Sequence, residues 1–178
     1  MPAPTAVDHG KRVAVRRTLA LAVCGACFLL AMSGGASEPH HDNLDVGRSY
    51  FEALSGGDWD RVRALAGPGF DFSDPTAAGR ETVLTSASDI ETLVGYMQAG
   101  REAVEAEAVI ERAFASGSLV TLIVHYRGRL RGDTPGAGRS FDAYGVAILT
   151  VTDGKVTAHV DYIDYETIDR QFGGLAVE

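Results

Sequence analysis

Between residues 141 and 171 the hydrophobic and polar positions repeat first with the period of a strand and then with that of a helix. Phe141–Thr152 is rich in apolar and β-branched residues, and Lys155–Tyr162 alternates, which predicts two strands. The predicted faces of the second strand are Val156, Ala158, Val160 and Tyr162 on one side and Thr157, His159 and Asp161 on the other. Asp153-Gly154 predicts a two-residue hairpin turn between them. Asp164 is the expected cap of a C-terminal helix that ends at Gly173-Gly174.

Upstream of residue 100 the apolar spacing is mainly helical. The predicted helices are Val46–Leu54, Trp59–Ala66 and Ile90–Gln98, and glycines or a capping aspartate stand at their ends. Phe70–Ser73 is predicted to form a short strand with its aromatic side chains on one face. Gly79–Val83 is interpreted as a short helix or a loop.

Two further strands are predicted in the middle of the chain. Val104–Phe114 has the Ala and Glu content of a helix, but Gly117-Ser118 after it is typical of a hairpin, so we predict a strand. Leu119–Arg129 begins with apolar residues on both faces and later carries His125, Arg127 and Arg129 on one side. Gly132–Gly138 is predicted to be a hairpin loop. Helices followed by long strands indicate the α+β class, with helices on one sheet face and a second copy of the chain expected on the other.

The N-terminal residues have the pattern of a secretory signal peptide. Basic residues 11–17 precede the apolar run Leu19–Met32, and small residues follow, with cleavage expected after Ala36 or Ser33. The run is about 14 residues long, shorter than the roughly 20 that a membrane span needs. We therefore predict a signal peptide over 1–36, a flexible linker over 37–44 and one domain over 45–178, in a secreted or periplasmic protein. A membrane anchor formed by an uncleaved segment is the alternative.

The route of export is left open by the basic and cysteine residues of this segment. Arg16-Arg17 resembles a twin-arginine signal, although an ordinary basic region is favoured, and Cys27 raises the alternative of lipidation. Both cysteines of the chain, Cys24 and Cys27, lie within the predicted signal. The domain after it is therefore predicted to have no disulfide and no thiolate chemistry.

Charge excludes several classes of partner. Residues 1–36 hold four of the 16 basic and one of the 24 acidic residues, so the remainder has 12 basic and 23 acidic residues, a formal net charge of −11. Such a domain is a poor partner for nucleic acid or an anionic membrane surface, so we predict no nucleic acid and no membrane contact beyond the export signal. Motifs for phosphate, dinucleotide or metal binding are missing from the sequence, which predicts no cofactor and no metal.

Five segments, in order over residues 45–173, carry a resemblance to a known family. They are Tyr50–Trp59, Phe72–Pro75, Asp153–Val156, Asp161–Asp164 and Arg170–Gly173. Together they resemble the SnoaL-like branch of the nuclear transport factor 2-like superfamily. The resemblance implies a cone-shaped, curved antiparallel sheet packed against three N-terminal helices, with a short C-terminal helix, a closed-off pocket and often a homodimer through the sheet. Because this superfamily contains both enzymes and binding proteins, the fold alone does not assign a function.

One enzyme pattern of the superfamily is only partly present. In members similar to limonene epoxide hydrolase, an acid precedes an aromatic on the last strand, and Asp161 matches it. An Arg and an Asp two apart on a middle strand fall on His125 and Arg127, so Arg127 replaces the expected acid. The first-strand Tyr and Asn fall near Asp71 and Ser73. The resemblance therefore does not imply hydrolase activity.

The remaining polar residues form a candidate acid–base site. His125 is a candidate general base because its unperturbed pKa lies near neutrality, with Asp161 orienting it or acting itself. Arg127 would hold a carboxylate or an enolate oxygen. Candidate ligand contacts are Asp71, Ser73, His159 and Tyr144. The structural alternatives are an Asp161–Arg127 pair across strands, a solvent-facing His159 and tyrosines that only pack.

Three functional hypotheses follow. The first is a binding protein with an apolar pocket for a small hydrophobic molecule, without catalysis. The second is a cofactor-independent isomerase, lyase or cyclase that acts on a carbonyl compound by acid–base chemistry. The third is a protein–protein module that uses the open sheet face. The enzyme is favoured if His125, Arg127 and Asp161 face one cavity within hydrogen-bond reach, and the idea fails if they point outward or if side chains fill the cavity.

Overall fold

The computed structural model describes residues 43–132 and 136–172. In chain order its elements are α1 (Asn43–Gly56), α2 (Trp59–Leu65), β1 (Ala66–Ser73), the 3-10 turn η1 (Pro75–Ala77), β2 (Ser86–Ala87), α3 (Ile90–Ala103), β3 (Val104–Ser116), β4 (Leu119–Leu130), β5 (Ser140–Thr152), β6 (Lys155–Ile163) and α4 (Tyr165–Gln171). The predicted signal peptide, most of the predicted linker, part of the loop Gly132–Gly138 and the glycines after α4 lie outside the described residues. No helix within the described ranges is long and apolar enough to cross a membrane.

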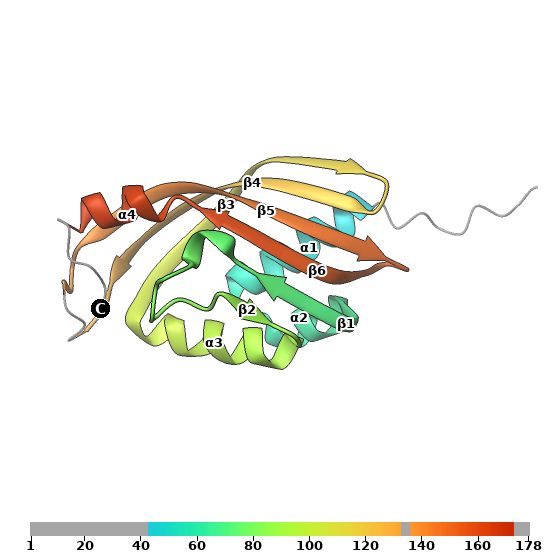
Figure 1. The fold of residues 1–178 in the computed structure, drawn as a ribbon, viewed down its shortest axis with the longest axis horizontal. Coiled ribbons are helices and arrows are strands. Elements are labelled where there is room, and N and C mark those ends of the chain that lie inside the picture. The colour runs from blue at the N-terminus through green and yellow to red at the C-terminus, as the bar shows by residue number, and fades with distance from the viewer. Residues whose placement is uncertain (1–42, 133–135, 173–178) are drawn as a thin grey trace, which may run out of the picture. The chain divides into compact units, whose positions relative to one another are not determined.

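The six strands form one curved sheet in the order β2-β1-β6-β5-β4-β3, as Figure 1 shows. All neighbours are antiparallel except β1 and β6, which run parallel. The four long strands, β3 to β6, are therefore joined as successive hairpins, as the sequence predicts. The α+β class and the curved sheet are confirmed.

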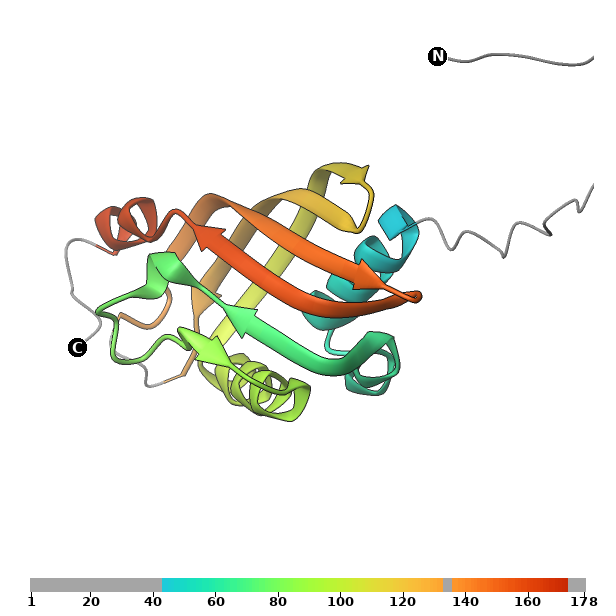
Figure 2. The same cartoon turned by 45° about the vertical axis from the view of Figure 1, so that its right-hand side comes forward.

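Helices α1 and α3 lie on the concave side of the sheet. Helix α1 contacts β3, β4, β5 and β6, so it crosses the centre of the concave face. Helix α3 contacts β1 and β2 at one sheet edge and β3 at the other (Figure 2). It therefore spans the opening between the two edges.

The apolar stripe predicted for the first helix forms part of the core. Val46, Tyr50, Ala53 and Leu54 are all buried, and they belong to the same cluster as the alternate β4 residues Val120, Leu122 and Val124. Helix α3 extends five residues beyond the predicted end at Gln98 and leads directly into β3. The short strand β2 was not predicted, because two residues carry no periodic pattern.

The hairpin and the cap around β6 are confirmed. Asp153 and Gly154 both have positive φ, 51° and 71°, as a type I′ turn requires. The Asp164 carboxylate accepts a hydrogen bond from the Thr167 backbone N–H at 2.9 Å, and α4 starts at the next residue. Local sequence signals therefore set both ends of β6.

The predicted alternation along β6 is wrong at its start. Leu149 pairs with His159 and Val151 pairs with Val156, so β6 has one extra residue opposite β5, a β-bulge. Val156 and His159 consequently lie on the same buried face, although the sequence pattern separates them. The bulge turns the odd-numbered residues from His159 onward toward the concave side.

Candidate functional site

A cavity of about 560 Å³ lies between the concave sheet face and helices α1 and α3. This volume is within the range of small-molecule sites, roughly 300–1,000 Å³. Most of its wall is apolar and comes from α1, β1, the segment before β2, α3, β3 and β6: Phe51, Leu54, Phe72, Val83, Leu84, Leu93, Met97, Val104 and Ile163. Small residues on β3, Ala106 and Ala108, also line it, and their size leaves room under the sheet.

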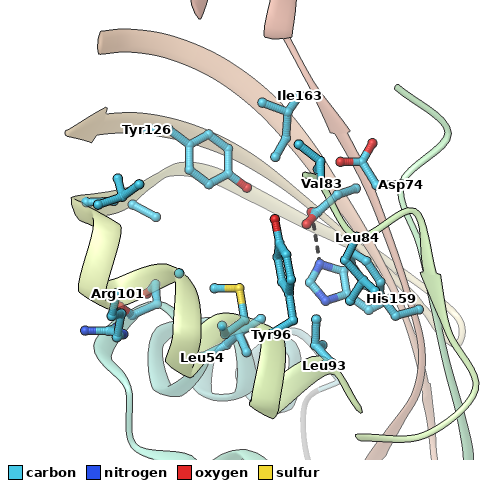
Figure 3. A pocket seen from close by; sticks show the side chains of 18 of the residues that line it. Leu54, Asp74, Val83, Leu84, Leu93, Tyr96, Arg101, Tyr126, His159 and Ile163 are labelled. Atoms are coloured by element: carbon cyan, nitrogen blue, oxygen red, sulfur yellow. Dashed lines mark hydrogen bonds and ion pairs between the residues drawn. The ribbon is translucent and has the colours of Figure 1, made fainter. Parts of the chain in front are cut away.

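A buried histidine and an aspartate from β6 form the polar centre of the cavity. His159 is 1% exposed, and its Nε2 lies 3.0 Å from Oδ1 of Asp161, as drawn in Figure 3. On the other side of the ring, Nδ1 lies 3.4 Å from the Tyr50 hydroxyl. Burial, and then the charge of Asp161, raises the pKa of the Tyr50 phenol well above its usual value. An imidazole tautomer with its proton on Nε2 accepts from the Tyr50 hydroxyl at Nδ1 and donates to Asp161 at Nε2.

Aromatic residues hold the His159 ring in place. The rings of Phe72, Tyr50 and Phe51 meet it nearly edge-on, with centroids 5.3, 5.7 and 6.2 Å away. These residues come from β1 and α1, so the imidazole is clamped between the sheet and the helix layer. A clamped ring presents Asp161 to the cavity in one orientation. His159 therefore does not face solvent, and that structural alternative is wrong.

Two phenols reach the cavity from other elements. Figure 3 shows Tyr126 of β4 and Tyr96 of α3 with their hydroxyl groups directed toward the interior. Burial, and then the charge of Asp161, raises the pKa of Tyr126 well above its usual value, so this phenol stays protonated. No hydrogen-bond partner for the Tyr126 hydroxyl exists among the described residues. Tyr126 is therefore a free donor close enough to Asp161 to feel its charge.

The buried acid Asp74 fixes part of the cavity wall through hydrogen bonds from both of its carboxylate oxygens. Its Oδ1 accepts from the Thr76 and Ala77 backbone N–H groups at 2.9 and 3.2 Å, and its Oδ2 accepts from the Tyr165 hydroxyl at 2.7 Å. Burial, and then this hydrogen bond, raises the pKa of Tyr165 well above its usual value. The pair ties η1 to α4, and its role is structural.

The structure separates two predicted catalytic residues from the cavity. His125 and Arg127 lie on the outer, convex face of β4, because the even-numbered residues of that strand face the helices. His125 lies 2.6 Å from Asp142 and stacks on Tyr144 with ring centroids 4.5 Å apart. Arg127 pairs with Glu107 at 3.4 Å. The predicted convergence of His125, Arg127 and Asp161 in one pocket is therefore wrong, and the enzyme hypothesis built on those three residues fails. Tyr144 does not line the cavity.

The predicted ligand contacts on β1 also lie elsewhere. Asp71 is exposed, and neither it nor Ser73 lines the cavity, because the aromatics Phe70 and Phe72 occupy the inner face of the strand. Of the predicted site residues, the fold brings together His159 and Asp161. Sequence reasoning missed Tyr50 and Tyr126 as polar groups of the site. The apolar periodicity of the helix that holds Tyr50 and of the strand that holds Tyr126 could have identified them, because it places both residues on inward faces.

The solvent-exposed end of the cavity carries arginines. Arg101 of α3, Arg131 at the end of β4 and Glu105 of β3 line it. Among the described residues no group of three or more His, Cys, Asp or Glu side chains is arranged to hold a metal ion.

Comparison with known proteins agrees with this architecture. Residues 48–159 match the family model of the SnoaL-like domain. Solved structures with the same fold include IdmH, a candidate polyketide cyclase from Streptomyces antibioticus (25% identity, 75% of this chain and 99% of that chain, TM-score 0.64). A candidate SnoaL-like polyketide cyclase from Shewanella denitrificans OS-217 is 26% identical (75% and 98% covered, TM-score 0.63).

The fold is also shared with a more distant enzyme, an LEH-like epoxide hydrolase from M. tuberculosis (17% identity, 74% and 89% covered, TM-score 0.58). No curated protein matches the sequence. The family match covers more than half of the chain, and the sheet and helices agree with it. The chain therefore belongs to the SnoaL-like domain family and has a nuclear transport factor 2-like fold.

Proposed function

We propose that the protein is a cofactor-independent isomerase, lyase or cyclase that acts on a hydrophobic carbonyl compound by acid–base chemistry. One observation carries the proposal: Asp161, held by the buried His159, shares an apolar cavity with the free phenol of Tyr126. A base and a hydrogen-bond donor for the oxygen are the two groups that proton abstraction next to a carbonyl needs. The two relatives at 25% and 26% identity, both candidate polyketide cyclases, support this class of reaction.

In the proposed reaction Asp161 takes the proton from the carbon next to the carbonyl, and the C–H electron pair becomes an enolate. Tyr126 donates a hydrogen bond to the enolate oxygen. Return of the proton to another carbon completes an isomerisation. In a cyclisation the enolate carbon instead attacks a second carbonyl of the same molecule, and the new alkoxide takes the proton from Asp161. His159 positions the carboxylate throughout.

Proton abstraction can be tested without knowing the natural substrate. Exchange of α-hydrogens for deuterium in a panel of hydrophobic ketones and diketones, followed by NMR in D₂O, reports the first step directly. We expect Asp161→Asn to slow the catalysed exchange by about 10²–10⁴-fold, the usual contribution of a general base. Tyr126→Phe should slow it less, because the ring and the cavity shape are kept.

Asp71→Asn is the matched control, because it removes a carboxylate that is exposed and outside the cavity. It should leave exchange unchanged. Equal rates in the wild type and Asp161→Asn would contradict the proposed base.

The second candidate function is binding of a hydrophobic molecule without catalysis, which the largely apolar lining favours. Export, as predicted from residues 1–36, also suits a carrier. This candidate is supported if a small molecule co-purifies with the protein, is retained by Asp161→Asn and shows no exchange or turnover.

A further inference from the structure

The charged side chains of the cavity are divided between its two ends. At one end Asp161 lies beside the buried His159, and the cavity wall there also includes the buried Asp74. Arg101, Arg131 and Glu105 are exposed wall residues, and the Arg131 backbone N–H donates to the Ala103 carbonyl at 2.8 Å, two residues after Arg101. Figure 3 shows Arg101 across the cavity from His159 and Asp74. The apolar wall lies between these two sets, so a ligand that fills the cavity meets opposite charges at its two ends.

Arg101 is held in place without a carboxylate partner. Its guanidinium donates to the Ser55 backbone carbonyl and lies over the Trp59 ring, with Cζ 5.3 Å from the ring centroid. No acidic side chain pairs with it among the described residues. A guanidinium has five N–H donors, so most of them remain for a ligand. Its orientation is already set, which lowers the entropy lost when an anion binds.

Arg131 is only weakly neutralised. Its Nη2 lies 3.8 Å from Oε2 of Glu105, and the same oxygen lies 2.8 Å from Nη2 of Arg129. One carboxylate is therefore shared between two guanidinium groups, and the closer of the two is not part of the cavity wall. With Arg101 included, this end of the cavity has an excess of positive charge, although the whole chain has a formal net charge of −8.

We propose that the ligand is amphiphilic and carries an anionic group, such as a carboxylate, which Arg101 and Arg131 bind at the exposed end of the cavity. The apolar part then lies along the wall. The acids at the buried end repel an anion, so the ligand enters with its uncharged end first. The inference rests on the proposed function for one point, that the uncharged end carries the carbonyl that reaches Asp161 and Tyr126.

Two probes of matched shape test the proposal. Decanoate and the neutral decanamide each compete with the neutral fluorophore N-phenyl-1-naphthylamine for the purified protein. We expect decanoate to compete at lower concentration than decanamide. Arg101→Gln and Arg131→Gln should each lower the affinity for decanoate by about three- to tenfold, as expected for the loss of charge-assisted hydrogen bonds at an exposed site. Both variants should leave the affinity for decanamide unchanged. Added salt should reduce the preference of the wild-type protein for decanoate.

The controls separate recognition from structure and from overall charge. Arg101→Lys keeps the charge and should retain part of the preference. Arg112→Gln changes the net charge equally but lies outside the cavity wall, so it should have no effect. Equal competition by the two probes in the wild type would overturn the proposal. The proposal would also be overturned if Arg112→Gln lost as much affinity for decanoate as Arg101→Gln and Arg131→Gln do.

The affinity for decanamide shows whether a variant has damaged the structure of the cavity. If Arg101→Gln weakens decanamide as much as decanoate, the effect of that variant is structural, and Arg131→Gln alone decides the matter. If it too weakens both probes equally, the proposal fails. The proposed reaction is tested separately: Asp161→Asn should slow deuterium exchange by about 10²–10⁴-fold while the preference for decanoate over decanamide remains. Unchanged exchange would contradict the reaction but not the anion site.

Discussion

Tyr50 keeps a protonated phenol in the core with no solvent exposure. Its hydroxyl contacts His159 at 3.4 Å, and burial together with the charge of Asp161 raises its pKa. The raised pKa makes the free energy of unfolding fall at alkaline pH. In the unfolded chain tyrosine ionises near pH 10, whereas Tyr50 in the folded protein stays protonated. The unfolded state is therefore favoured as the pH rises above about 10.

Replacement of Tyr50 by Phe should make this alkaline loss of stability less steep. The stability contribution of the raised pKa is fully present below pH 10 and is lost above it, by up to about 1.4 kcal/mol per pH unit for each such phenol. Urea unfolding between pH 8 and pH 11 measures the free energy of unfolding directly. Tyr50→Phe should cost about 1 kcal/mol at pH 8, because His159 loses a hydrogen bond, but show the smaller slope. Identical slopes would contradict the assignment.

At the scale of elements, the site depends on how closely β4, β5 and β6 approach one another. Gly145 of β5 lies beneath the Tyr126 ring, and a Cβ there would come within 2.8 Å of Tyr126 Cε2 and of the Tyr162 backbone oxygen. The second contact is with backbone, which cannot move aside alone. The absence of a side chain at this residue therefore lets the Tyr126 phenol lie flat against the sheet and reach the cavity.

Gly145→Ala should destabilise the protein by about 1–3 kcal/mol, as overpacking in a core does, and slow the deuterium exchange by displacing Tyr126. Thermal unfolding and the exchange assay measure the two effects. Gly95→Ala is the control, because no atom lies within 4 Å of its added Cβ on α3. It should raise stability by up to about 1 kcal/mol, and a similar gain in Gly145→Ala would refute the packing argument.

At the scale of the whole molecule, the main feature is the exposed convex face of the sheet. Large apolar side chains on this sheet are well exposed: Phe114 54%, Leu119 48%, Tyr144 49% and Tyr162 42%. The same face carries both signs of charge, with His125 and Arg127 beside Asp142, Glu107 and Glu111. We propose that a second copy of the chain covers it, since a face that is apolar and balanced in charge can pair with itself about a twofold axis.

Sedimentation equilibrium tests this homodimer. Tyr162→Glu puts a charge in the middle of the exposed apolar residues and should shift a dimer toward monomer, while binding of the neutral fluorophore in the cavity is kept. Asp71→Asn, on β1 at the far side of the sheet order, should leave the association unchanged. A wild-type protein that sediments as a monomer at all concentrations would refute the dimer and favour a different partner for this face.

Sequence by itself determined the order of the main helices and of the four long strands, although the two-residue strand β2 was not predicted. The turn at Asp153-Gly154, the cap at Asp164 and the apolar stripe of α1 are local, since each depends on residues within about one turn of helix or one hairpin. They give the same answer in any tertiary context. The α+β class followed from them, as did the family through its ordered segments.

Tertiary structure decided which residues share the site. Both faces of β4 begin apolar, so its alternation does not say which face the helices cover, and the covered face turned out to exclude His125 and Arg127. A bulge in β6 then shifted the alternation by one residue and turned His159 and Asp161 inward. Because the side-chain period of a strand is two, either choice moves a whole set of residues to the opposite face. The cavity therefore depends on packing between distant elements, which no local pattern records.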